Sequence, residues 1–310
     1  MEISLLLMQQ IAQLFLILIM GYAVVKAGLL KASDSRVLSV VMVYLVTPCV
    51  IINAFQIDDT PEIRKGLLYS MAIAAAIHVV LLGISALLSR PLKLDAVEQV
   101  NVIYSNAAAL VIPLVRALLG DEYVIYSCAF IIVQLILLWT HASSLLQGSS
   151  ALDWKKVLTN INMIAIAAGA LLYWFRVVLP APLQNTMSTV GNMMGPMGML
   201  LAGMAIAEKP LREVFCTRRN YLPTVLRLVV CPLVVLVLLW VCHASSWVAD
   251  GKNILMTVYL AAITPACATV TSMAQLYDRD AAHSSALYVL TTLLSIVSMP
   301  VMIGLFDLLL

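Results

Sequence analysis

Two apolar stretches of the chain combine a proline with polar residues in surroundings that would otherwise suit a membrane helix. In YSNAAALVIPLVRALLG, Asn106 precedes Pro113 by seven residues, and in AAITPACATVTSMAQ several hydroxyl groups follow Pro265. A proline inside a helix removes one backbone hydrogen bond and clashes with the carbonyl group four residues earlier. In lipid, the released groups need new partners or a wet cavity. The prolines therefore predict either simple packing kinks or two helix breaks that form a polar site.

Thr264 and Pro265 also have the order typical of a helix start, with threonine at the cap and proline at the first helical position. A half-helix that began here would direct free N–H groups and the positive end of its dipole into the centre of the membrane. Such a helix end prefers an anion. We therefore expect Thr264 and Pro265 to contribute to an anion-binding site.

Asn106 is the foremost polar candidate, because an amide without partners is costly in hydrocarbon. It could contact a substrate beside the expected break, or it could form an interhelical hydrogen bond. Gln134, within the next apolar stretch, could line the same pathway. Arg116 could extend to the outer interface or make an outer vestibule electropositive. The weaker candidates for the site or its pathway are Ser105, Thr269, Thr271, Ser272 and Gln275.

The composition indicates that membrane helices position these residues. Of the 310 residues, 63% are hydrophobic and 11% are charged, and the mean hydropathy is +1.01. A helix needs about 20 residues to cross a bilayer core, and the apolar runs accommodate ten such crossings. We expect an all-α polytopic membrane protein with spans at 4–25, 36–56, 66–88, 97–119, 123–146, 157–178, 184–207, 221–242, 253–276 and 283–309.

Basic residues between the spans predict the orientation of the chain. The odd-numbered connections hold Lys26, Lys31, Arg36, Arg90, Lys93, Lys155, Lys156, Lys209, Arg212, Arg218, Arg219 and Arg279. The even-numbered connections hold only Arg64, Lys65, Arg116, Arg176 and Lys252. Because basic residues are enriched in cytoplasmic connections, the odd connections are predicted to be cytoplasmic and both termini to lie outside.

Landmark residues indicate an internal duplication. Three pairs recur at a separation of 148 or 152 residues: Gly21 with Gly169, Pro48 with Pro196, and Pro113 with Pro265. Each half would hold five spans, and since five is odd, the second half would cross the membrane upside down. This inverted arrangement is typical of secondary transporters, whose sites lie near the midplane at discontinuous helices. We expect a first repeat at 1–146, a cytoplasmic connection at 147–156 and a second repeat at 157–310.

The chain lacks the sequence signatures of several other classes of protein. The net charge of +2 and the absence of a basic tail argue against nucleic-acid binding. The six cysteines are scattered without metal-ligand spacing, so we interpret them as reduced packing residues. The chain contains no GxSxG, HExxH or Walker sequence and no acidic pair within a span that would indicate an enzyme. We expect no catalytic residue, no metal and no organic cofactor.

The motifs together resemble the auxin efflux carrier family, which includes bacterial permeases and the plant PIN carriers. SNAAALVIPLVRALLGDEY resembles the family's fourth helix, and VQLILLWTHASSLL is similar to its fifth. The stretch from TPACATV to LSIVSMP is similar to the ninth and tenth helices, and GYAVVKAGLL to the opening of the family. The long cytoplasmic loop of the plant carriers is absent, so the chain resembles a bacterial member of the inner (plasma) membrane.

The resemblance implies a fold of the bile-acid symporter type, with two inverted five-helix repeats. Helices 4 and 9 would cross at their prolines and hold the substrate carboxylate, and a homodimer would form through a scaffold of helices 1, 2, 6 and 7. By position, the binding candidates are Asn106, Pro113, Gln134 and Pro265. Ala266 and Cys267 depart from the family pattern, in which a polar residue commonly follows the ninth-helix proline.

The function expected from these observations is the transport of a small organic acid anion by elevator-type alternating access. The substrate would be a dicarboxylate or an auxin-like monocarboxylate, with proton or sodium coupling left open. A close alternative is a sodium-coupled symporter of the bile-acid type, with Ser105, Thr269 and Thr271 as oxygen ligands. An alternative of another class is a membrane receptor or structural protein that transports nothing.

Overall fold

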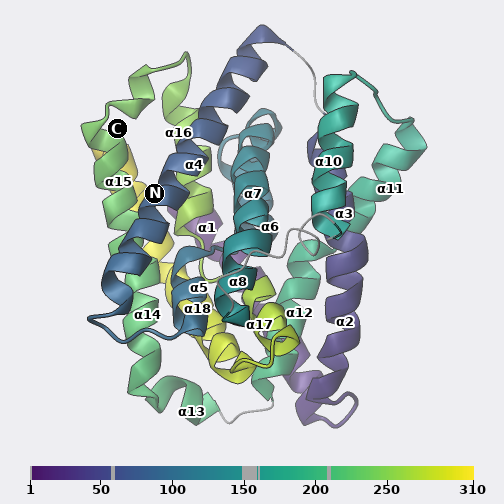
Figure 1. The fold of residues 1–310 in the computed structure, drawn as a ribbon, viewed down its shortest axis with the longest axis vertical. Coiled ribbons are helices and arrows are strands. Elements are labelled where there is room, and N and C mark those ends of the chain that lie inside the picture. The colour runs from purple at the N-terminus through teal and green to yellow at the C-terminus, as the bar shows by residue number, and fades with distance from the viewer. Residues whose placement is uncertain (1, 57–59, 149–158, 160, 208–210) are drawn as a thin grey trace.

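The computed structural model describes residues 2–56, 60–148, 159, 161–207 and 211–310 (Figure 1). Helices make up the regular structure, and these ranges contain no β-strand. Extended segments pair at one place within them, an isolated antiparallel bridge between Ser105 and Ala266. The structure is therefore all-helical, and its one bridge joins segments that are 161 residues apart in the sequence.

The helices of the first half are interrupted at several points. In order they are α1 (Glu2–Lys26), α2 (Ser35–Val41), the π-helix η2 (Met42–Val46), α3 (Thr47–Ala54), α4 (Pro61–Ser89), α5 (Ala96–Ile103), α6 (Ala107–Leu118), α7 (Val124–Leu137), the π-helix η4 (Leu138–Ala142) and α8 (Ser143–Gln147). The connection expected at 147–156 lies mostly outside the described residues.

The second half has the same irregular character. Its helices are α10 (Ile161–Trp174), α11 (Ala181–Gly191), α12 (Met194–Ala207), α13 (Leu211–Cys216), the short 3-10 helix η5 (Arg218–Asn220), α14 (Tyr221–Val225), the π-helix η6 (Leu226–Val230), α15 (Cys231–Val241), α16 (Gly251–Ile263), α17 (Ala268–Leu276) and α18 (Ala281–Leu309).

Five helical stretches are long and apolar enough to cross a membrane. They are Ser35–Asn53, Pro61–Ser89, Val124–Gln147, Arg218–Val241 and Ala281–Leu309. Large apolar side chains remain on the surface, among them Trp174 at 80% exposure and Leu87 at 75%, as lipid contact requires. The protein is therefore an integral membrane protein. Of the other five expected spans, the first holds the continuous helix α1 (Glu2–Lys26), whereas the remaining four hold helices that are interrupted or described over a shorter length. The ten-span inverted repeat therefore stays a prediction.

The helices form two groups with close backbone contacts at glycines. Helix α1 packs along α12, where a Cβ atom on Gly21 would lie 2.3 Å from the Leu200 carbonyl oxygen and one on Gly203 would lie 1.9 Å from that of Leu18. Helix α10 packs on α3, where a Cβ atom on Gly169 would lie 2.3 Å from the Phe55 ring. Figure 1 shows α2, α3, α10 and α11 together on one side, and α4, α15 and α16 on the other.

Candidate functional site at the helix crossover

Two helices are interrupted in the interior of the protein, and their interruptions touch. The segment Tyr104–Asn106 separates α5 from α6, and a second segment of four residues, 264–267, separates α16 from α17. The Asn106 N–H donates to the Pro265 carbonyl at 2.8 Å, and the Cys267 N–H donates to the Tyr104 carbonyl at 3.1 Å. These antiparallel hydrogen bonds hold the two segments together. We call this pair of segments the crossover.

The first interruption does not lie where the sequence predicted it. Helix α6 continues through Pro113 to Leu118, so the prediction that Pro113 breaks the fourth span is wrong. The chain is interrupted just before Asn106 instead, and Asn106, not Pro113, is the residue that faces Pro265. Membrane helices tolerate an interior proline where its surroundings satisfy the freed carbonyl group. The side chains of Pro113 and Arg116 lie outside the described part of the structure.

The second interruption also differs from the expected helix start. Thr264 has an extended backbone and follows the last residue of α16, while α17 begins only at Ala268 with Cys267 as its cap. The Thr264 hydroxyl donates to the Ala261 carbonyl at 3.0 Å, which is the carbonyl that Pro265 deprives of its helical partner. Thr264 therefore closes the end of α16 and does not open α17.

Gln134 of α7 fixes the first segment of the crossover. Its Oε1 atom accepts hydrogen bonds from the Ser105 N–H at 3.0 Å and from the Ser105 hydroxyl at 2.6 Å. Its Nε2 atom donates to the Ser105 carbonyl at 2.8 Å. Both side chains are buried. One amide therefore forms hydrogen bonds with the N–H, the carbonyl and the hydroxyl of Ser105, so Gln134 positions the crossover. Its own oxygen and nitrogen are both engaged in these bonds.

Arg227 of η6 was not among the predicted site residues, yet it lies at the centre of the crossover. Its guanidinium is fully buried and donates to the main-chain carbonyls of Val102 and Ile103 at 3.1 Å each, and to Thr264 at 3.0 and 2.8 Å. A further bond reaches the Ala262 carbonyl. We call these four oxygens the carbonyl cage. They lie at the C-terminal ends of α5 and α16, where helices carry unpaired carbonyls and partial negative charge.

A sequence signal for Arg227 was present. It is the basic residue that lies within the apolar run 220–241, and an ionisable residue inside a membrane segment is by default a candidate for a functional site. Arg227 was not counted among the basic residues of the connections, because it lies within an expected span. No carboxylate among the described residues contacts its guanidinium, so the charge is balanced only by the carbonyl cage.

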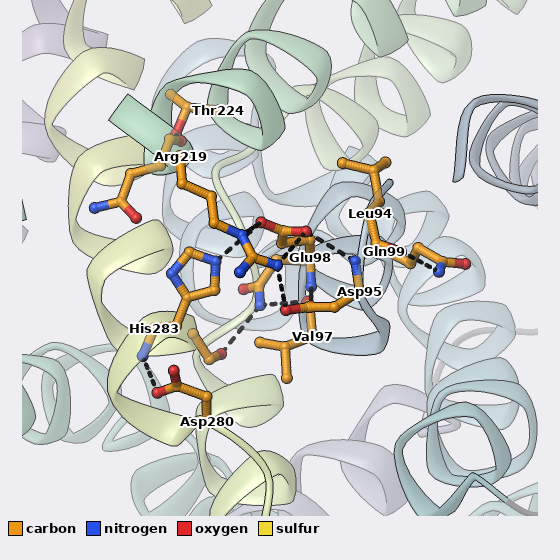
Figure 2. Close-up of polar contacts among 12 residues, drawn as sticks. Leu94, Asp95, Val97, Glu98, Gln99, Arg219, Thr224, Asp280 and His283 are labelled. Carbon is orange, nitrogen blue, oxygen red and sulfur yellow. Dashed lines mark hydrogen bonds and ion pairs between the residues drawn. The ribbon is translucent and has the colours of Figure 1, made fainter. Parts of the chain in front are cut away.

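A cluster of charged side chains holds the opposite end of α5 (Figure 2). The Arg219 Nε atom lies 2.6 Å from Glu98 and its Nη2 atom 2.8 Å from Asp95, and His283 approaches Glu98 at 3.2 Å. The ligand atoms of Asp95, Glu98 and His283 are close enough together for a metal ion, but the Arg219 guanidinium already bonds to both carboxylates. We interpret the cluster as an anchor for the first turn of α5.

A cavity of about 40 Å³ borders the crossover between α2, α12, α17 and α18. Ala268, the first residue of α17, contributes to its wall. Most of the other residues in its wall have uncharged polar side chains: Ser35, Ser39, Thr271, Ser272, Gln275, Ser285 and Tyr288. The Ser285 hydroxyl is buried and has no hydrogen-bond partner. Such a group calls for a water molecule or a ligand.

Asn106 connects the crossover to this cavity. Its side-chain nitrogen lies 3.5 Å from the Tyr288 hydroxyl, which is in the cavity wall and also donates to the sulfur of Met199. Asn106 is buried, and it caps α6 without a side-chain bond to the first turn of that helix. Its amide is therefore held only weakly in this conformation.

The structure brings together many of the predicted residues but divides them by role. Asn106, Ser105, Thr264 and Pro265 form the crossover, and Gln134 supports it. Thr271, Ser272 and Gln275 line the cavity, whereas Thr269 lies in the first turn of α17 and is not part of the cavity wall. Sequence reasoning missed Arg227 and two residues of α18, Ser285 and Tyr288, whose surroundings in HSSALYVLTT read as an ordinary membrane helix.

Comparison with known protein families agrees with this architecture. A family model described as "Membrane transport protein" matches residues 6–152 and 149–303. The chain belongs to this family. The resemblance to auxin efflux carriers is thereby confirmed, because the model is that of the auxin efflux carrier type of membrane transport protein. No curated protein matches the chain significantly. Members of the family are transporters, so the crossover and its cavity belong to a membrane transport protein.

Proposed function

We propose that this membrane transport protein carries a small organic acid anion whose carboxylate binds at the crossover. The observation that carries the proposal is the buried positive charge of Arg227, which no described carboxylate contacts. The carbonyl cage uses the hydrogen-bonding capacity of the guanidinium, but the net charge of the region remains positive. A carboxylate in the adjacent cavity would balance it.

Three kinds of donor are placed to hold that carboxylate. The Asn106 amide is weakly engaged, and the Tyr288 hydroxyl lies beside it in the cavity wall. The N-terminal end of α17 opens at Ala268 on the same cavity, and the first N–H groups of a helix have no partners within it. The unpartnered Ser285 hydroxyl is a second, independent sign that this space receives a polar ligand.

The cavity wall favours an acid with a single carboxylate. Seven of its ten residues are polar and uncharged, and no lysine, arginine or histidine is part of it. A second carboxylate would enter this space without a cation, and a desolvated charge without a partner is costly. We therefore expect a monocarboxylate with polar or aromatic substituents to bind better than a dicarboxylate of similar size.

Transport would require the two walls of the cavity to separate. A volume of about 40 Å³ holds only a few water molecules, so a larger acid needs more room. Helices α2 and α12 form one wall and α17 and α18 the other, with a hydrogen bond between Ser39 and Ser272 joining them. In an elevator movement, α17 and α18 would move together with the crossover, while α2 and α12 would stay in place with α1. This movement would open the cavity and carry the site across the membrane.

Orientation, assembly and driving force belong to the same proposal. The bias of basic residues favours cytoplasmic odd-numbered connections, and in that orientation the cavity would lie on the cytoplasmic side of the crossover in a bacterial inner membrane. A homodimer through the scaffold helices is proposed from the family resemblance alone. An interior-negative potential would favour efflux of a monoanion by about 2.3 kcal/mol per 100 mV.

A binding screen tests the proposal. Purified protein in detergent is heated with a panel of monocarboxylates and dicarboxylates, with the matching amides as neutral controls, and its unfolding temperature is recorded. We expect at least one monocarboxylate to stabilise the protein saturably, with weaker effects from its dicarboxylate analogue and none from its amide. Equal stabilisation by acids and amides, or by none of them, would contradict the anion carrier.

A further inference from the structure

Arg227 makes an unusual set of hydrogen bonds for a buried arginine. A guanidinium has five N–H donors, and the structure gives it five bonds, all to the carbonyl cage: one from Nε, two from Nη1 and two from Nη2. The cage oxygens belong to Val102, Ile103, Ala262 and Thr264. The side chain is therefore fully occupied and cannot contact a substrate.

The carbonyl cage has the chemistry of a cation site. In secondary transporters with discontinuous helices, unwound carbonyls and the C-terminal ends of half-helices coordinate the coupling sodium ion or proton. Here two half-helices, α5 and α16, direct carbonyls at one buried point. Their dipoles add negative potential to that point. A cation is required there, and the chain provides its own.

We propose that Arg227 is a tethered cation that takes the place of a coupling ion at the crossover, so that this protein binds its substrate anion without sodium. The inference rests on the proposed function, in which the crossover binds an anion. A bound ion that enters and leaves with each transport cycle contributes its gradient to the work of transport. A side chain cannot leave, so Arg227 supplies the positive charge without supplying a driving force.

Two of the three hydroxyls considered for sodium are engaged in hydrogen bonds within the protein. The Ser105 hydroxyl donates to Gln134 at 2.6 Å, and the Thr271 hydroxyl lies 3.1 Å from that of Ser284. Gln134 belongs to α7 and Ser284 to α18. The described residues thus provide one concentrated set of cation ligands at the crossover, and Arg227 fills it.

The test measures ion dependence without any substrate. Unfolding temperatures of the purified protein are recorded in sodium, potassium and choline chloride at constant ionic strength, and saturable binding of radioactive sodium is measured directly. We expect equal unfolding temperatures in the three salts and no saturable sodium binding. A saturable stabilisation by sodium over choline, or stoichiometric sodium binding, would overturn the inference.

A substituted protein gives the complementary result. In Arg227→Ala the carbonyl cage loses its cation, and millimolar methylguanidinium should raise the unfolding temperature saturably. Arg219→Ala, which removes an exposed guanidinium near the other end of α5, is the matched control and should show no such rescue. Failure of methylguanidinium to stabilise a folded Arg227→Ala protein would contradict the inference.

Two further measurements keep the inference open to refutation. If Arg227→Ala yields no folded protein, the second variant is Arg227→Lys, which retains the charge with fewer donors. Arg227→Lys should fold without becoming sodium-dependent. Sodium-dependent folding of the wild-type protein would refute the inference. Because none of these readings uses an acid, they remain valid when the acid screen fails. Failure of that screen would instead contradict the proposed function.

Discussion

At the crossover, the groups bonded by Arg227 and Gln134 differ from Ser285 and Asn106 in how completely they are satisfied. On the side of η6, the carbonyls at the ends of α5 and α16 are held by Arg227, and Gln134 of α7 satisfies Ser105. On the side of the cavity, the Ser285 hydroxyl is buried without a partner and Asn106 makes only a 3.5 Å contact. The first side holds the broken helices together, and the second is where we propose that the anion binds.

This difference separates residues that maintain the site from residues that use it. Removing a group from the satisfied side leaves buried partners without hydrogen bonds, which lowers stability. Removing the Ser285 hydroxyl breaks no protein contact, and removing the Asn106 amide breaks one long contact, so binding should suffer more than folding. Measuring stability and anion binding on the same variants therefore tests the division directly, since each side predicts a different ratio of the two losses.

The largest loss of stability is expected for Arg227→Met. This change leaves the four oxygens of the carbonyl cage without donors, and each buried unsatisfied group costs about 1–3 kcal/mol. We expect a total loss of about 3 kcal/mol or more, measured as the free energy of unfolding in detergent. Arg219→Met, at a side chain that is 58% exposed, is the control and should lose far less. Similar losses in the two variants would contradict the central place of Arg227.

A smaller loss is expected for Gln134→Leu. The substitution keeps the approximate volume but removes the three hydrogen bonds to Ser105, so the unfolding free energy should fall by about 1–3 kcal/mol. Gln147→Leu removes a single bond to Ser143 at a half-buried position and serves as the control. If Gln134→Leu abolished anion binding while keeping full stability, Gln134 would belong to the binding side instead.

Asn106→Ala should separate binding from stability. The interhelical contact that it removes is long and worth about 0.6 kcal/mol, whereas a hydrogen bond to a carboxylate is worth about 1.5–3 kcal/mol, or about 10- to 100-fold in affinity. Anion affinity should therefore fall strongly with little change in unfolding temperature. Asn101→Ala is the control, because its amide bonds Val97 and Ser284 away from the crossover. Equal losses of stability and affinity in Asn106→Ala would favour a structural asparagine.

The smallest effect is expected at two adjacent serines of α18. Ser285→Ala removes a hydroxyl that has no partner, so stability should change by less than about 0.5 kcal/mol while anion affinity falls a few-fold. Ser284→Ala removes contacts with Asn101 and Thr271 and should lower stability without changing affinity. The reverse pattern, read from melting curves and ligand titrations, would show that Ser285 plays no part in the site.

Sequence patterns predicted the helical membrane protein, because apolar length is a local property. They also singled out Asn106, which lies in the crossover. They placed the first break wrongly, since Pro113 is a recognised helix breaker but α6 tolerates it. The break depends on Gln134, which reaches Ser105 from 29 residues away, and only tertiary packing reveals such a pair.

The rest of the candidate site was hidden for a similar reason. Arg227 stands in a span whose neighbours on both sides are apolar, and its partners are main-chain carbonyls that no side-chain pattern records. Ser285 and Tyr288 are common membrane-helix residues whose meaning comes from the cavity that α2 and α17 complete. A buried arginine in a membrane segment was nonetheless a readable signal.

Counterflow in proteoliposomes tests the central claim most directly. Vesicles that contain the purified protein are loaded with an unlabelled monocarboxylate selected by the binding screen, and the uptake of the labelled acid is followed. We predict that wild-type protein accumulates the label transiently in sodium-free buffer, and that Asn106→Ala does so much more slowly while Asn101→Ala matches the wild type. No accumulation by the wild-type protein, or equal accumulation by Asn106→Ala, would contradict an anion site at the crossover.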